Sequence, residues 1–170
     1  MNWEAIGAIG EIIGAIAVVA TLAYLAHQIR QNSNAIKGST ISAITQHQQF
    51  ELHWSSEISS AMRKIVDGSG DLTEDELWQA SEFFTASLTT RQNEYFQYKN
   101  GLLLEESWDA SKKVIRVIFG IEWVEEWYNT YGKEVLTDVF NEEIEKIVQE
   151  QKFDFVSTYE EIRKIGVNDT

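Results

Sequence analysis

Residues Ala5 to Ala26 read AIGAIGEIIGAIAVVATLAYLA, and this stretch decides the fold. Its 22 residues are all apolar or small apart from Thr21, Tyr24 and one charged residue, Glu11. At ~1.5 Å per residue, a helix of this length covers about 33 Å, close to the ~30 Å hydrocarbon core of a bilayer. Trp3 and Tyr24 flank the run, as aromatic residues do at membrane interfaces. We therefore expect a transmembrane anchor within residues 1–26.

Two other interpretations of this run are a buried core helix and a cleaved signal peptide. The run is apolar on every face, and a small domain could hardly cover all of it. A signal peptide begins with basic residues and has a shorter apolar stretch, whereas this chain begins Met1-Asn2-Trp3-Glu4. Both alternatives are disfavoured.

The charges that flank the run predict its orientation. No acidic residue occurs from Ile12 to Phe50, and Arg30 and Lys37 follow the run, while Glu4 precedes it. Basic residues stay on the cytoplasmic side. We expect a single-pass protein of the inner membrane with its N-terminus outside and its C-terminal domain in the cytoplasm.

Composition excludes several classes of partner and site. The formal charges of residues 1–50 cancel, so the net charge of −13 lies wholly in residues 51–170. Such an acidic body repels phosphate backbones, and nucleic acid is not an expected partner. The chain has no cysteine, which excludes disulfides and thiolate metal sites, and no proline, which favours long helices.

The chain beyond the anchor predicts further helices. No turn signal interrupts Ala26 to Val66, so we expect residues 27–66 to extend the anchor as one long helix, with a bend near Asn32–Asn34 or Gly38. Asp67 to Asp71 then forms a turn.

The next helix has clear signals at both ends. Thr73 and Glu76 have the spacing of a capping box, in which each side chain accepts a hydrogen bond from the other residue's backbone N–H. The helix is expected to run to Asn100, with Gly101 as its C-terminal cap.

We expect three more helices, with the first ending at Gly120 and the second at Gly132, and a short helix in the tail: Leu104–Phe119, Ile121–Tyr131, Leu136–Gln151 and Thr158–Lys164. No sustained strand-like alternation occurs. The predicted fold is all-α, with a small helical bundle over residues 73–152 and a tail over 153–170.

Two parts of the sequence resemble a known family. The first is the opening MNWEAIGAIGE with the later stretch Gln28-Ile29-Arg30-Gln31-Asn32. The second runs from Arg91-x-x-Glu94 through Tyr98 to GLLxEExW at residues 101–108, followed by Trp123-x-x-x-Trp127 and Phe140. Together they resemble a large family of uncharacterised bacterial membrane-anchored helical proteins over about residues 1–148. That family often has a proline-containing turn where this chain has Phe119-Gly120-Ile121. The resemblance implies a single anchor and a helical domain in bacteria, and it implies no catalytic residue.

Small residues form a stripe along the anchor at spacings of three and four: Gly7, Gly10, Gly14, Ala17 and Thr21. Such spacing lets helix backbones approach closely in a membrane. Because one anchor can use this stripe only against another chain, we expect a homo-oligomer. Glu11 lies beside the stripe and costs at least ~2.5 kcal/mol in an apolar run unless it is paired, hydrated or protonated. It is interpreted as a glutamate that hydrogen-bonds between packed helices, or alternatively as a pore-lining or proton-binding carboxylate.

The stripe has a candidate continuation outside the membrane. A seven-residue repeat places apolar residues at one position and mixed residues at another: Ala15, Leu22, Ile29, Ile36, Ala43 and Phe50, and Val18, Leu25, Asn32 and Ser39. This pattern is typical of a coiled-coil seam in which Asn32 sets the register. The alternative is that the same face packs on the chain's own next helix.

The remaining polar and aromatic positions have structural interpretations. Arg91 and Glu94, three residues apart, are expected to form an ion pair inside the bundle. His47 and Glu51 share a helix face, but two ligands do not make a metal site. The aromatic residues Tyr95, Tyr98, Trp108, Trp123 and Trp127 are expected in the core, and solvated helix faces are expected at Glu105, Glu106, Glu125, Glu126, Glu142 and Glu143.

No phosphate loop, nucleophile motif or dinucleotide fingerprint is present. We therefore expect no catalytic residue, no cofactor and no metal. The leading hypothesis is a membrane-anchored, self-associating assembly or interaction module. The alternative is a small homo-oligomeric ion channel lined by the first helix, with Glu11 in the pore. An enzyme whose site arises only from assembled side chains is the third and weakest hypothesis.

Overall fold

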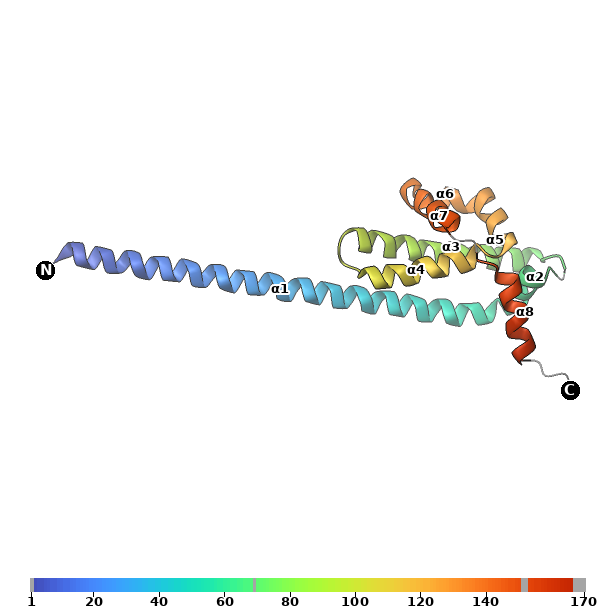
Figure 1. The fold of residues 1–170 in the computed structure, drawn as a ribbon, viewed down its shortest axis with the longest axis horizontal. Coiled ribbons are helices and arrows are strands. Elements are labelled where there is room, and N and C mark those ends of the chain that lie inside the picture. The colour runs from blue at the N-terminus through green and yellow to red at the C-terminus, as the bar shows by residue number, and fades with distance from the viewer. Residues whose placement is uncertain (1, 69, 151–152, 167–170) are drawn as a thin grey trace. The chain divides into compact units, whose positions relative to one another are not determined.

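The computed structural model describes residues 2–68, 70–150 and 153–166, apart from the side chains of residues 5, 50–52, 54–57, 156 and 166. All regular elements in these residues are helical, which confirms the all-α prediction (Figure 1). Their bounds are α1 Trp3–Glu57, α2 Ser59–Asp67, α3 Glu74–Lys99, α4 Glu105–Ile118, α5 Glu122–Trp127, the π-helical turn η1 Tyr128–Gly132, α6 Lys133–Val135, α7 Asp138–Glu150 and α8 Phe155–Gly166.

The chain divides into two compact units, residues 1–39 and residues 40–170. The first unit is the N-terminal part of α1, and the second, called the body here, holds the rest of α1 and all the other helices. Helix α1 is continuous through Asn32–Asn34 and Gly38, the positions at which the sequence predicts a bend.

The long helix predicted to run through Val66 is interrupted at Ile58, and this part of the prediction is wrong. Ile58 has φ −92° and ψ 16°, outside the helix, and α2 starts at the next residue. The physical reason is burial. Ile58 and Ala61 are almost fully buried, and Met62 and Ile65 pack against the core. These four residues form an apolar stripe at helical spacing, and the break at Ile58 orients this stripe toward the core of the body.

The capping box predicted at the start of α3 is confirmed. The Glu76 backbone N–H donates to Thr73 Oγ1 at 3.2 Å, and the Thr73 N–H donates to Glu76 Oε2 at 2.9 Å. Lys64 of α2 donates to the same carboxylate oxygen at 2.6 Å. The hydrogen bond from Lys64, followed by that from the Thr73 backbone, lowers the pKa of Glu76 to about 2. One carboxylate therefore caps α3 and links it to α2.

The core of the body lies among α3, α4, α5 and α7 and is rich in aromatic rings. Tyr95 lies 5.4 Å from Trp108 and 5.7 Å from Phe140, between ring centroids. Tyr95, Trp108 and Trp127 are buried, and Tyr98 and Trp123 pack against the core while partly exposed. These aromatic residues occupy the core, as predicted.

Helix α5 does not end at Gly132, and that prediction is also wrong. The chain continues as the π-helical turn η1 through Gly132 into α6, and Gly132 has an ordinary helical φ of −58°. A Cβ at Gly132 would lie 3.0 Å from ring atoms of both Trp127 and Tyr128. Glycine fits this position because two buried rings approach the backbone closely, although the helical conformation does not stop here.

Gly120 follows the end of α4, as predicted, and allows another close approach. A Cβ at this position would lie 2.6 Å from the backbone oxygen of Phe153 and 3.0 Å from Cβ of Phe155. The segment before α8 therefore packs directly on the turn after α4.

Helix α8 begins earlier than the predicted Thr158, because Asp154 caps its N-terminus. The carboxylate of Asp154 accepts a hydrogen bond from the Ser157 backbone N–H at 3.0 Å, as an N-terminal cap does. The helix then runs from Phe155 to Gly166. Helices α3, α4 and α7 have bounds close to those predicted, although the end proposed for α7 at Gln151 lies outside the described residues.

Candidate functional site

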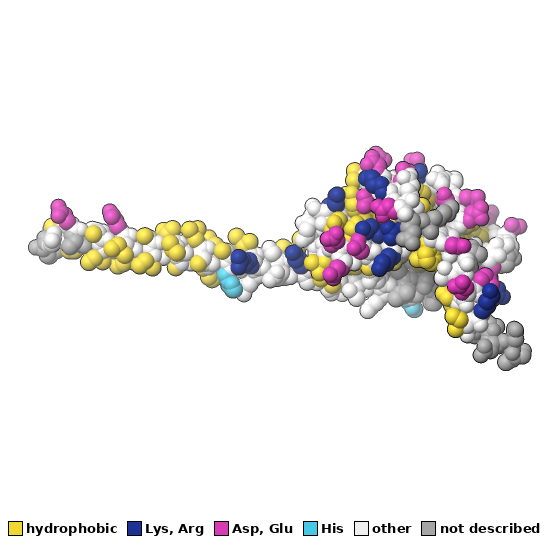
Figure 2. Space-filling view, viewed as in Figure 1, with side chains coloured by type: hydrophobic (Ala, Val, Ile, Leu, Met, Phe, Trp, Pro, Cys, Tyr) yellow, Lys and Arg dark blue, Asp and Glu magenta, His cyan; other side chains and the backbone are white. Residues whose placement is uncertain are grey.

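The N-terminal part of α1 has the length and composition of a membrane-spanning helix. Residues Ile6 to Gln49 contain a window apolar enough to cross a bilayer, and none of that window is buried within the chain. Ile12, Ile16 and Val19 are each more than 60% exposed. Figure 2 shows hydrophobic side chains along the visible face of this segment. A core helix is mostly buried, so this exposure differs from that of a core helix.

The small-residue stripe is open on the surface of this helix. A Cβ added to Gly7, Gly10 or Gly14 would have no described side chain or remote backbone atom within 4 Å. Thr21 donates its hydroxyl proton to the Ala17 carbonyl at 2.8 Å, so this polar group is satisfied inside its own helix. The stripe is therefore accessible to a second helix.

Glu11 shares the face of the glycines. It follows Gly7 by four residues and precedes Gly14 by three, and residues at these spacings are neighbours on a helix surface. Its side chain is exposed. A helix packed on the glycine stripe would consequently come near this carboxylate.

The face of α1 with the seven-residue repeat is also exposed. Ile29 and Ile36 are 65% and 50% exposed. Asn32 between them is exposed as well, and Phe50 has a side chain outside the described residues. Within the body, α1 instead contacts the core through Ile44.

The predicted partners Arg91 and Glu94 lie in contact inside the body. Arg91 Nη1 donates to Glu94 Oε1 at 2.6 Å, and the two side chains are 4% and 1% exposed. The second Glu94 oxygen accepts a hydrogen bond from the Ser111 hydroxyl of α4. The hydrogen bond from Ser111 therefore links α4 to the buried pair on α3. Sequence reasoning missed Ser111, because its partner is on another helix and serine has no distinctive spacing.

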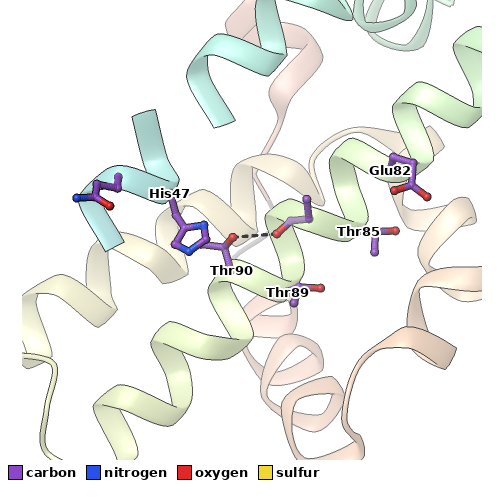
Figure 3. Close-up of a pocket in the computed structure, with 7 residues that line it drawn as sticks. His47, Glu82, Thr85, Thr89 and Thr90 are labelled. Carbon is purple, nitrogen blue, oxygen red and sulfur yellow. Dashed lines mark hydrogen bonds between the residues drawn. The ribbon is translucent and has the colours of Figure 1, made fainter. Parts of the chain in front are cut away.

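A groove of 620 Å³ opens between α1 and α3 in the body (Figure 3). Its lining is mostly short side chains, namely Thr85, Ala86, Thr89 and Thr90 of α3, with Glu82, Gln46 and His47. In Figure 3 the His47 ring points toward Thr90, whose hydroxyl donates to the Ala86 carbonyl at 2.9 Å. Threonine and alanine side chains form most of this lining, and His47 and Glu82 are its titratable groups.

His47 and Glu51 cannot be compared as a pair, because the Glu51 side chain lies outside the described residues. Among the residues that were described, no three His, Asp or Glu side chains are placed to hold a metal ion together.

Comparisons with models of protein families, with curated proteins and with solved structures found no match for this chain. The case for a function rests on its own residues.

Proposed function

We propose that this chain is a single-pass protein of a bacterial inner membrane and acts as a self-associating assembly or interaction module without catalytic activity. One observation supports this most strongly: the apolar N-terminal segment of α1 is exposed on all sides. Exposed apolar area costs about 25 cal/mol per Å² in water. A bilayer covers such a helix on every face, which no part of the chain does among the described residues.

The orientation follows from the charges beside the segment. Arg30 and Lys37 follow the apolar run and no acidic residue lies between Ile12 and Phe50. This bias supports a cytoplasmic body and an external N-terminus.

Self-association is supported by the open glycine stripe. In lipid, helices associate largely by close packing of their backbones, and glycines make that packing possible. The stripe meets no described side chain of its own chain at Gly7, Gly10 and Gly14. Another copy of α1 supplies the matching surface.

A mass measurement of the detergent-solubilised protein tests self-association. The wild type is expected to contain more than one copy, and Gly14→Leu is expected to dissociate it, because leucine separates the two backbones. Ala23→Leu is the control, since Ala23 lies on the opposite face of the helix and is exposed. A wild type that stays monomeric at every protein concentration would contradict the proposal.

Topology is tested separately in cells. Protease added to intact spheroplasts is expected to spare the body and digest it only after lysis. Digestion of the body from outside would reverse the orientation.

A small homo-oligomeric ion channel is the second candidate function. The observation that favours it is the position of Glu11 on the face of Gly7 and Gly14, because packing on that face in a ring of helices would gather the carboxylates around one axis.

A further inference from the structure

Residues 22–43 of α1, which begin inside the apolar run and extend beyond it, carry a seven-residue repeat suited to pairing with one other helix. The first position of the repeat holds Leu22, Ile29, Ile36 and Ala43, and the fourth holds Leu25, Asn32 and Ser39. β-Branched residues at the first position with leucine at the fourth favour two parallel strands, and Ile29, Ile36 and Leu25 fit this rule. These positions together are called the seam.

Seam residues of the first unit are exposed in the described part of the chain. Leu22, Ile29 and Ile36 are at least half exposed, while the contact of α1 with the core is made by Ile44, which lies off the seam. Gln46 continues the fourth position into the body, where its side chain is exposed and lines the groove between α1 and α3.

The charges of the segment permit a second copy to approach. Arg30 and Lys37 each follow a first-position residue and point away from the seam. The positions that flank the seam are all uncharged: Ala26, Gln28, Ser33, Ala35, Thr40 and Ser42. Two copies that pair through the seam therefore bring no like charges together. An acidic partner would find no basic residue at the seam, because Arg30 and Lys37 point away from it.

The glycine stripe adjoins this seam. Gly7, Gly14 and Thr21 occupy the seventh position of the same repeat, directly beside the fourth. Insertion of both anchors in the same direction would make the two helices parallel and in register, so that Asn32 faces Asn32. A polar side chain within a seam restricts register and the number of strands.

We propose that residues 22–43 of α1 form a parallel, two-stranded coiled coil with the same residues of a second copy, with Asn32 pairing across it. This inference rests on the proposed self-association and specifies its partner, direction and number of strands.

Disulfide trapping tests the inference cleanly, because the chain has no cysteine of its own. Ile29→Cys and Ile36→Cys are each introduced into the full chain in membranes and oxidised. Seam residues of parallel strands approach within the ~7 Å Cα separation that a disulfide needs. We expect dimeric product at both positions, several-fold more than for the control Asn34→Cys, which lies on the opposite face.

Each outcome decides between the two proposals. Equal trapping at residues 29, 34 and 36 would show random collision and overturn the coiled coil. An oligomer by mass without trapping at 29 and 36, or a mass above two copies, would overturn the coiled coil and leave self-association standing. A monomer by mass would overturn both.

Discussion

Two glycines show opposite consequences of adding one methyl group. We expect Gly120→Ala to destabilise the body by about 1–3 kcal/mol, the usual cost of overpacking, because its Cβ would lie 2.6 Å from the Phe153 backbone oxygen. Gly38→Ala is the control, since its Cβ meets nothing within 4 Å in mid-helix, and it should stabilise by about 0.5–1 kcal/mol. Urea unfolding in detergent, followed by tryptophan fluorescence, measures both. Equal effects would contradict the close approach at Gly120.

The buried pair of Arg91 and Glu94 predicts a large cost when one partner loses its charge. Glu94→Gln removes the carboxylate charge that lies 2.6 Å from Arg91 Nη1 inside the body, and we expect a loss of about 3–5 kcal/mol in the free energy of unfolding. The double variant Arg91→Met with Glu94→Leu removes both charges and should recover much of that loss. The same urea titration compares them. A single variant as stable as wild type would show that the ion pair contributes little.

At the residue scale, the sequence predicted contacts between residues close together on one helix, but not contacts between residues far apart in the chain. Arg91 and Glu94 share one helix, so their three-residue spacing predicted their contact. Ser111 is 17 residues from Glu94 on another helix, and only the packing of α3 on α4 reveals it. The requirement for glycine at position 120 depends on Phe153, which is still more distant along the chain.

At the element scale, the junction of α2 and α3 predicts a pH dependence. The pKa of Glu76 is lowered to about 2 in the folded chain from an ordinary 4.5, chiefly by the hydrogen bond from Lys64. A lowered folded pKa stabilises the protein above the unfolded pKa, and this contribution is lost as the pH falls from about 4.5 to about 2. The difference in Tm between wild type and Glu76→Gln should therefore be largest near neutral pH and shrink over this range. A difference that stays constant from pH 6 to pH 2 would contradict this role.

The capping box at the start of α3 was easier to predict than changes inside helices. The Thr73 capping box depends only on four consecutive residues, and the structure confirms it. The break at Ile58 is not marked by a nearby glycine or proline. It arises because the apolar residues Ile58 and Ala61 are buried in the body. Gly132 resembled a helix end because glycine commonly is one, yet its role comes from the rings of Trp127 and Tyr128.

At the scale of the whole molecule, Glu11→Gln separates the two proposed functions. Glutamine keeps the capacity for hydrogen bonds and removes the charge. A glutamate that only bonds between helices should tolerate the change, with the mass of the assembly unaltered. A pore-lining glutamate should not, because a ring of carboxylates selects cations, and bilayer recordings should then show altered conductance or selectivity. The absence of current from the wild type at any voltage would exclude the channel.

The continuity of α1 from Trp3 to Glu57 has a consequence for amide hydrogen exchange. One set of backbone hydrogen bonds would pass from lipid, through the exposed stretch that follows residue 26, into the body. Amides open to water exchange fastest where few contacts cover them. Exchange should therefore be slow in the anchor, fast around residues 27–39 of a single copy and slower again near Ile44. Pairing with a second copy would slow exchange only around residues 27–39. Deuterium uptake measured at successive amides of α1 would therefore show where the helix leaves the membrane and where a second copy covers it.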